Sequence, residues 1–250
     1  MKNLSESKNA DKSGVLFQVS LLQGLTNGDY YGSVSIGELK QHGDTGIGTF
    51  NKLNGELVML DGEVYRASGN GYIEAVPDEE TTPFAVTAFL ETDESAEMKA
   101  ISDIDALFNE LNKIVGKRSK NRFYMIRIDG TFSSINVRSV HKQEEPYKRL
   151  VDVLSVDQTL FDYENTEGSM VGLYCPAYMS SLNAAGWHLH FISKDKTKGG
   201  HVLGVHISEA VLTLKDIDAF EVRLPKNKMF SEFDLTIDQS ADIEKVEKNK

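Results

Sequence analysis

Three histidines lie close together in the last third of the chain, in a pattern that suits a metal ion. His188 and His190 stand two positions apart in the segment WHLHFIS, and His201 follows a short loop. Side chains alternate between the faces of a β-strand, so residues two apart share a face and lie roughly 6–7 Å apart at their backbones. Their ring nitrogens can then converge on one ion at about 2.0–2.1 Å, the distance typical of zinc.

The loop of residues 194–200 is short enough to return the chain antiparallel, which places His201 at the start of the neighbouring strand. Three protein nitrogens leave a fourth position open to water or substrate, as catalytic zinc requires. A single histidine on a strand is usually only a polar surface or core residue, but this trio rarely arises by accident. The pattern predicts that His188, His190 and His201 bind one divalent metal ion, with Zn²⁺ favoured.

The other three histidines do not fit this arrangement. His206 lies five positions after His201, so strand alternation is expected to place it on the opposite face. His42 and His141 lie in segments that resemble loops. None of the three is predicted to bind the metal.

The elements around the histidines are expected to be mostly strands. Residues 46–67 are predicted to form a meander with tight turns at Asn54-Gly55 and Asp61-Gly62, dipeptides that tolerate positive φ. A long hairpin is predicted over residues 122–140, turning at Asp129-Gly130. Further strands are expected at residues 84–90, 170–175, 187–193, 201–207, 210–214, 221–224 and 233–237.

Apolar residues at spacings of three and four predict one long helix from Met98 to Ile114, with a stop at Gly116. Ser102 with Asp105 is expected to cap its N-terminal part. A shorter helix is expected within residues 146–156.

Because strands outnumber helices and hairpins dominate, we expect an α+β fold of two sheet-centred halves, with largely antiparallel or mixed β-sheets flanked by a few helices. Residues 1–13 are polar and charged and are expected to form a flexible tail. Residues 14–140 are expected to form a β-rich domain with one long helix. Residues 141–250 are expected to form a second β-rich domain that carries the metal site.

The composition limits the partners and the location. The net charge of −11 disfavours binding to nucleic acid and to anionic membrane surfaces. No run is long and apolar enough for a signal peptide or a transmembrane span, so a cytoplasmic location is expected. The one cysteine, Cys175, excludes an internal disulfide and a thiolate zinc cluster, and is expected to be a small buried hydrophobic residue.

The segment GWHLHFIS, with the following GGHVL, resembles the acetolactate decarboxylases. So do GDTGIGTFNKLNGELVMLDGEVYR, FYMIRIDGTFSSINVRSV with its following EEPY, CPAY and VRLP. The likeness runs from about residue 15 to residue 247. It implies a zinc enzyme that converts 2-acetolactate to acetoin and carbon dioxide, with a tendency to form homodimers. The three zinc ligands of the family match His188, His190 and His201.

The resemblance also implies roles for single residues. The active-site carboxylate in the GEL motif matches Glu56, the arginine after the IDG turn matches Arg138, and a threonine in GxGTF near the metal matches Thr49. A glutamate from the C-terminal tail folds back to the site. Spacing from the third histidine favours Glu247, and Glu244, one helical turn away, is the alternative.

Without the resemblance, these residues have plainer interpretations. Glu56 and Arg138 look like charges on exposed strand faces, and the tail that contains Glu247 looks frayed. With it, zinc acts as a Lewis acid that stabilises an enediolate intermediate, and Arg138 is a fixed positive fork near the carboxylate or the developing charge. Glu56 and Glu247 are both candidates for the proton donor.

Two other functions remain open from the residues alone. The three histidines would equally serve another metal-dependent lyase or hydrolase that acts on a small polar substrate, since the chemistry of a zinc site depends on its surroundings. A non-enzymatic zinc site would be closed by four protein ligands, as when carboxylates bind permanently.

Overall fold

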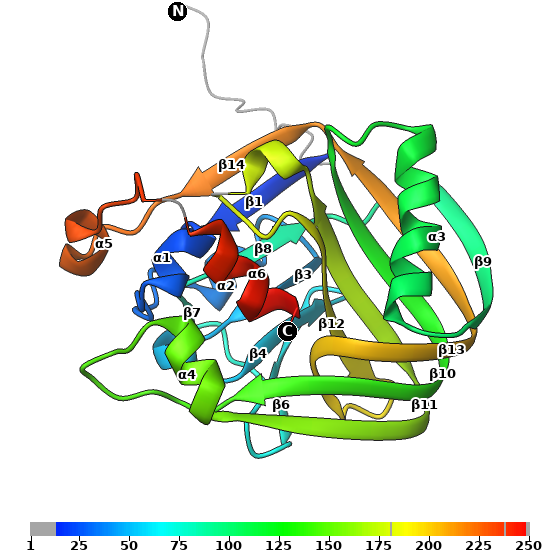
Figure 1. The fold of residues 1–250 in the computed structure, drawn as a ribbon, viewed down its shortest axis with the longest axis horizontal. Helices are drawn as coiled ribbons and strands as arrows, with labels where there is room; N and C mark the ends of the chain where they lie inside the picture. The colour runs from blue at the N-terminus through cyan, green and yellow to red at the C-terminus, as the bar shows by residue number, and fades with distance from the viewer. Residues whose placement is uncertain (1–13, 181, 238, 249–250) are drawn as a thin grey trace, which may run out of the picture.

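The alternating apolar segments of the chain form two large β-sheets that pack against each other (Figure 1). The computed structural model describes residues 14–180, 182–237 and 239–248, without the side chains of Ser240, Glu244, Glu247 and Lys248. The predicted α+β class with largely antiparallel sheets is confirmed, because only β1 and β14 pair in parallel among the described strands. The expected tail at residues 1–13 lies outside the described residues.

The first sheet has the strand order β14-β1-β8-β3-β4-β5-β6. Its strands are β1 (Val15–Val19), β3 (Thr45–Thr49), β4 (Glu56–Leu60), β5 (Glu63–Ala67), β6 (Ile73–Ala75), β8 (Ala85–Ala88) and β14 (Ala219–Arg223). A small sheet pairs β2 (Val34–Ser35) with β7 (Thr81–Thr82).

The predicted meander is present, but only one of its turns is tight. Asp61-Gly62 joins β4 to β5 with positive φ at both residues, as predicted. The turn predicted at Asn54-Gly55 is wrong in type, because residues 50–55 form a longer connection with a 3₁₀ turn (η1, Asn51–Leu53). The backbone N–H of Lys52 donates to the carbonyl of Tyr30, so a contact with another loop fixes this connection.

The second sheet closes on itself. Its strands are β9 (Glu94–Ile101), β10 (Phe123–Val140), β11 (Gln158–Cys175), β12 (Gly186–Ser193) and β13 (Gly199–Ile217). β10 pairs with both β11 and β13, and β12 lies between these two, so the four strands form a closed circuit that encloses an apolar core. The expected strands 201–207 and 210–214 are therefore parts of one long strand that is interrupted by bulges.

The hairpin predicted at Asp129-Gly130 is wrong, because β10 continues straight through it. Gly130 is paired on both sides, with Gly168 of β11 and with Ala210 of β13. A Cβ at position 130 would overlap the neighbouring strand, so the glycine serves a close approach of strands. Asp129 accepts hydrogen bonds from Arg127 and from Ser169 across the sheet. Ladder hydrogen bonds on both edges outweigh the local preference for a turn.

The long helix starts later than predicted. α3 spans Ile104–Lys117, and Asp103 is its N-cap, accepting a hydrogen bond from the N–H of Ala106. Met98 and Ile101 belong to β9, where they pair with β13 and are buried in the same core that α3 covers. Their spacing fits a helix by chance, because strand pairing and not periodicity decides their conformation.

The short helices α1 (Leu22–Thr26), α4 (Leu150–Val156) and α6 (Ser240–Lys248) lie together on one side of the molecule (Figure 1). α2 (Ile36–Leu39) packs on the outer face of the first sheet, and α5 (Lys228–Glu232) buries no residue. α6 packs on α1 and α4 through Ile243 and Val246. The C-terminal tail, which looks frayed from its charged composition, is thus helical over α6. The strand predicted at residues 233–237 is wrong, because this segment connects α5 to α6 without strand pairing.

The sheets divide the chain differently from the expected boundary at residues 140/141. β9 and β10 lie before this boundary but pair with β13, while β14 lies after it and pairs with β1.

Within the described residues, none of the helices combines the length and apolar character that crossing a lipid bilayer demands.

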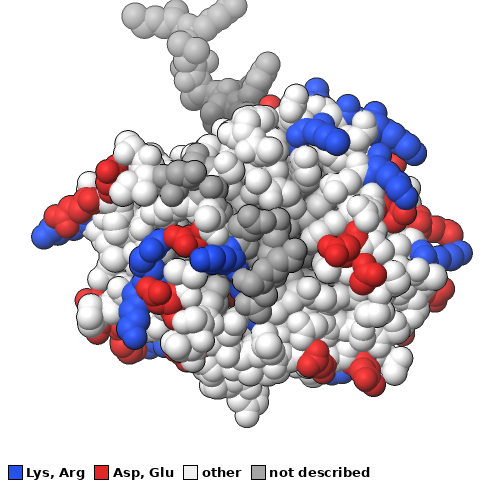
Figure 2. All heavy atoms as spheres, viewed as in Figure 1, with Lys and Arg blue, Asp and Glu red and all other residues white. Residues whose placement is uncertain are grey.

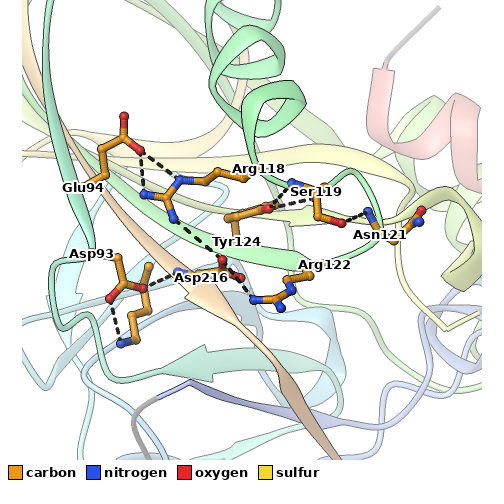
Figure 3. Close-up of polar contacts among 9 residues, drawn as sticks. Asp93, Glu94, Arg118, Ser119, Asn121, Arg122, Tyr124 and Asp216 are labelled. Atoms are coloured by element: carbon orange, nitrogen blue, oxygen red, sulfur yellow. Dashed lines mark hydrogen bonds and ion pairs between the residues drawn. The ribbon is translucent and has the colours of Figure 1, made fainter.

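Basic side chains gather at the upper right of the face shown in Figure 2, where the C-terminal end of α3 lies. Positive charge there complements the partial negative charge at the end of a helix. Figure 3 shows how this end is tied to the sheet. Arg118 donates to Glu94 at 2.7 and 2.9 Å, and both Arg118 and Arg122 lie near Asp216. The backbone N–H of Asp216 in turn donates to Asp93 at 2.8 Å.

We expect the buried hydroxyl in this region to matter more than its ion pairs. The hydroxyl of the fully buried Tyr124 donates to the carbonyl of Ser119 and accepts from its N–H. Tyr124→Phe leaves both backbone groups without that partner, so the free energy of unfolding should fall by about 1–3 kcal/mol. Glu94→Gln, which weakens a partly exposed ion pair, should cost less than about 1 kcal/mol. Urea unfolding measures both, and a larger loss in Glu94→Gln would contradict this ranking.

Candidate active site

The three predicted histidines converge in the layer between the two sheets. On β12, Leu189 and Phe191 face the enclosed core, and His188 and His190 share the opposite face, as predicted. His190 pairs directly with His201 on β13. Nε2 of His188 lies 3.1 Å from Nε2 of His190 and 3.0 Å from Nδ1 of His201. The three buried rings can present one ligand atom each within 4.8 Å of one another.

A hydrogen bond to the first sheet fixes the orientation of His190. Its Nδ1 lies 2.8 Å from the carbonyl oxygen of Leu57 on β4. A carbonyl only accepts, so Nδ1 carries the hydrogen and Nε2 of the neutral ring keeps its lone pair. That lone pair faces the other two histidines. The carbonyl of Leu57 is the kind of second hydrogen-bond partner that a metal-binding histidine normally has.

A β-bulge decides which residues of β13 face the site. Leu203 is an extra residue on β13 relative to β10, so Val202 and Val205 both face the enclosed core although they are three positions apart. His201 and His206 consequently both point away from that core, and the predicted opposite faces are wrong. His206 is nevertheless exposed and outside the histidine cluster, since five strand residues span roughly 16 Å.

Arg138 comes from β10, where it pairs with His201. It is 3% exposed, so it does not lie on the open strand face that its sequence neighbours suggest. Arg138 lines the same cavity as the three histidines. A buried guanidinium beside these imidazoles can bind a carboxylate through two parallel hydrogen bonds.

The first sheet contributes Glu56 and Thr49, which pair with each other across β3 and β4. Glu56 is 8% exposed, and its Oε2 lies 3.6 Å from Nε2 of His190. The hydroxyl of Thr49 donates to the carbonyl of Gly55 at 2.7 Å. Thr49 thereby holds the residue that precedes Glu56, and both side chains line the cavity.

Burial and positive charge lower the pKa of His188 and His190. Burial, with a smaller contribution from Arg138, lowers the pKa of His188 from 6.5 to about 3. Burial, with contributions from His188 and Arg138, also holds the pKa of His190 well below its usual value. Neutral imidazoles have the lone pairs that a metal ion requires.

The arrangement fits a zinc ion. Two nitrogens at about 2.0–2.1 Å from a tetrahedral zinc lie roughly 3.3 Å apart. The observed separations of 3.0 and 3.1 Å are close to this value. Three buried imidazoles, one of them held by a backbone carbonyl, and a neighbouring carboxylate form a donor set suited to a divalent ion.

Apolar side chains from three short helices cover the site, and the sequence patterns did not predict this cover. The cavity is small, about 40 Å³. The covering residues are Leu22 and Leu25 of α1, Leu150 and Leu154 of α4, and Val246 of α6. Spacings of three and four give these helices apolar faces, but only the fold shows what the faces cover. The side chains of Glu244 and Glu247 lie outside the described part of α6.

The loop before β12 is fixed by buried amides. Gln18 of β1 donates to the carbonyl of Leu182, and its own side-chain oxygen accepts from Asn183. Asn183 also accepts from the N–H of Ala184. The strand with His188 is thereby held to the first sheet.

Cys175 is buried in the layer between the sheets, as predicted, and burial raises the pKa of its thiol to about 12.

Comparison with known proteins assigns the family. A family model described as alpha-acetolactate decarboxylase matches residues 16–237. The alpha-acetolactate decarboxylase of Methanosarcina mazei is 38% identical over 99% of this chain and 85% of its own length. That of Bacillus licheniformis is 38% identical over 97% of this chain and 94% of its own length.

Solved structures show the same fold. The crystal structure of the alpha-acetolactate decarboxylase of Bacillus subtilis strain 168 superimposes with a TM-score of 0.89, at 35% identity, over 93% of this chain and 99% of that one. Since both the family model and these relatives span most of the sequence, the chain belongs to the alpha-acetolactate decarboxylase family of enzymes.

Proposed function

We propose that this enzyme converts 2-acetolactate to acetoin and carbon dioxide with a Zn²⁺ ion held by His188, His190 and His201. The observation that carries the proposal is the meeting of three buried imidazoles with Arg138 and Glu56 in one small cavity. The relatives from Methanosarcina mazei and Bacillus licheniformis are alpha-acetolactate decarboxylases, and this supports 2-acetolactate as the proposed substrate.

The reaction requires charge stabilisation and then one proton. The bond between the carboxylate carbon and the hydroxyl-bearing carbon breaks, and its electron pair moves toward the adjacent ketone to give an enediolate and carbon dioxide. One proton added to carbon then gives acetoin. The barrier is the developing negative charge, so groups fixed where that charge develops accelerate the reaction.

The residues of the cavity divide these tasks. A bound zinc ion would supply Lewis-acid stabilisation of the developing charge. Arg138 has the geometry to hold the carboxylate or to face the developing charge, and burial strengthens this interaction. The leucines of α1 and α4 exclude water around it. Thr49 positions the turn before Glu56.

Two carboxylates are proposed for the proton. Glu56 lies within 3.6 Å of a ligand nitrogen. Glu247 is proposed from the family resemblance, with Glu244 as the alternative, since Val246 of the same helix lines the cavity. A homodimeric state and a cytoplasmic location are also proposed from the sequence, and size-exclusion chromatography and cell fractionation test them.

The first test measures metal and product together. Purified protein should contain close to one zinc per chain and release acetoin from 2-acetolactate, and a chelator should abolish the activity. Alanine at His188, His190 or His201 should remove zinc and activity together, because two imidazoles bind zinc much more weakly than three.

The matched control is His206→Ala, which removes an exposed histidine from the same strand as His201. It should keep both zinc and activity. Zinc-loaded wild-type protein that releases no acetoin would refute the proposed reaction, and full zinc content in His201→Ala would refute the three-histidine site.

Arg138→Lys should keep zinc and lose most of the activity. Lysine preserves the positive charge but not the planar pair of donors, so turnover should fall by roughly two orders of magnitude, as for loss of a donor to a developing oxyanion. Zinc content and steady-state kinetics measure this. Turnover equal to the wild type would leave Arg138 with a purely structural role.

The metal-free protein should lose stability in acid. The folded-state pKa of His188, about 3, lies below its unfolded value near 6.5, so the unfolded chain binds more protons between these limits. Stability is therefore complete above about pH 6.5 and falls below it by about 1.4 kcal/mol per pH unit for each such histidine. Urea unfolding of the chelated protein from pH 7 to pH 5 measures the slope. An equal slope in chelated His188→Ala would contradict this origin.

A further inference from the structure

A second cavity adjoins the histidine site on the side of α3. Its volume is about 340 Å³, and it lies between α3 and the beginnings of β12 and β13. Ile104, Phe108 and Asn112 of α3 form one wall, and residues 184–189 and 201–203 form the other. We propose that this space, which we name the α3 cavity, is the route by which substrate reaches the metal site.

The site cavity alone is too small for the substrate. It measures about 40 Å³, whereas one water needs roughly 10–15 Å³ and small-ligand pockets usually measure roughly 300–1,000 Å³. On one side it is lined by leucines of α1 and α4 and by Val246. These residues belong to a single buried apolar cluster, so passage there requires that packed helices separate.

The two cavities share two walls. His188 and His201 line both of them, and their facing nitrogens are 3.0 Å apart. A ligand in the α3 cavity therefore lies next to two of the three proposed metal ligands. The α3 cavity, unlike the site cavity, has room for a five-carbon acid.

The wall of the α3 cavity is held by a side-chain hydrogen bond. Nε1 of Trp187 donates to Oδ1 of Asn112 at 2.9 Å, which ties β12 to α3. Asp105 also lines the cavity, but it lies in the first turn of α3, where the helix dipole offsets its charge. In the proposal, a small anion passes this wall toward Arg138 and the bound metal ion.

This inference rests on the proposed function for the identity of the substrate, but access to the metal can be tested without it. Ala185 is exposed and lines the α3 cavity, so Ala185→Phe fills the opening without replacing a core residue. Ala75→Phe, on an exposed position of β6 in the other sheet, is the matched control. Thermal unfolding should show both variants folded.

The first measurement is the second-order rate constant for removal of zinc by dipicolinate. Ala185→Phe should lower it by about tenfold or more, since restricted access slows association over one to three decades, while Ala75→Phe should not change it. For acetolactate, kcat/KM of Ala185→Phe should fall by a similar factor at wild-type zinc content. Unchanged rates of both processes in a folded, zinc-loaded Ala185→Phe would overturn the proposal.

The second measurement uses the wild-type chain. Trp187 is its one tryptophan, so fluorescence reports on the cavity wall directly. Acetoin should change the Trp187 emission with the same concentration dependence as its inhibition of the enzyme. Inhibition without any change in emission would overturn the proposal. If the zinc-loaded wild type released no acetoin, the proposed function would fail, and the dipicolinate rates would still decide whether the α3 cavity leads to the metal.

Discussion

The site depends on the hydrogen bond from His190 to the carbonyl of Leu57, because this bond joins the two sheets where their functional residues meet. The three histidines and Arg138 belong to the closed sheet, while Glu56 precedes Leu57 on the open one. A shift of β4 by one residue would turn Glu56 to the opposite face and remove the carbonyl from His190. The packing between the sheets is therefore part of the chemistry, and the apolar layer that includes Cys175 maintains it.

Sequence patterns succeeded where one strand or one turn decides the structure. Side chains alternate between the two faces of a strand, so the shared face of His188 and His190 follows from their spacing of two residues. Asp61-Gly62 forms the tight turn that this dipeptide favours. They failed where a distant strand decides. Asp129-Gly130 has turn chemistry, yet pairing on both edges keeps it extended. Met98 has helical spacing, yet it pairs with β13. These outcomes depend on contacts between residues far apart in the chain, which local periodicity does not contain.

The site itself divides in the same way. Its histidines were predicted from spacing, but Glu56 and Arg138 looked like solvent-exposed strand charges and were chosen only by resemblance to a family. Both are buried, because each lies on a face that the other sheet or a short helix covers. The bulge at Leu203 illustrates the limit most clearly, because one extra residue reverses the alternation of side chains along β13. His206 lies outside the histidine cluster as expected, but the opposite strand face that was predicted for it is wrong.

The parallel pairing of β1 with β14 bears on how the protein is made. Translation releases the chain from its N-terminus, so β1 has an open edge until residues 219–223 have left the ribosome. A nascent chain that stops before residue 219 would carry every histidine of the cluster and still expose that edge. Such a product is a target for chaperones and for edge-to-edge aggregation, so premature termination late in the gene yields a hazardous fragment and not a partly working enzyme.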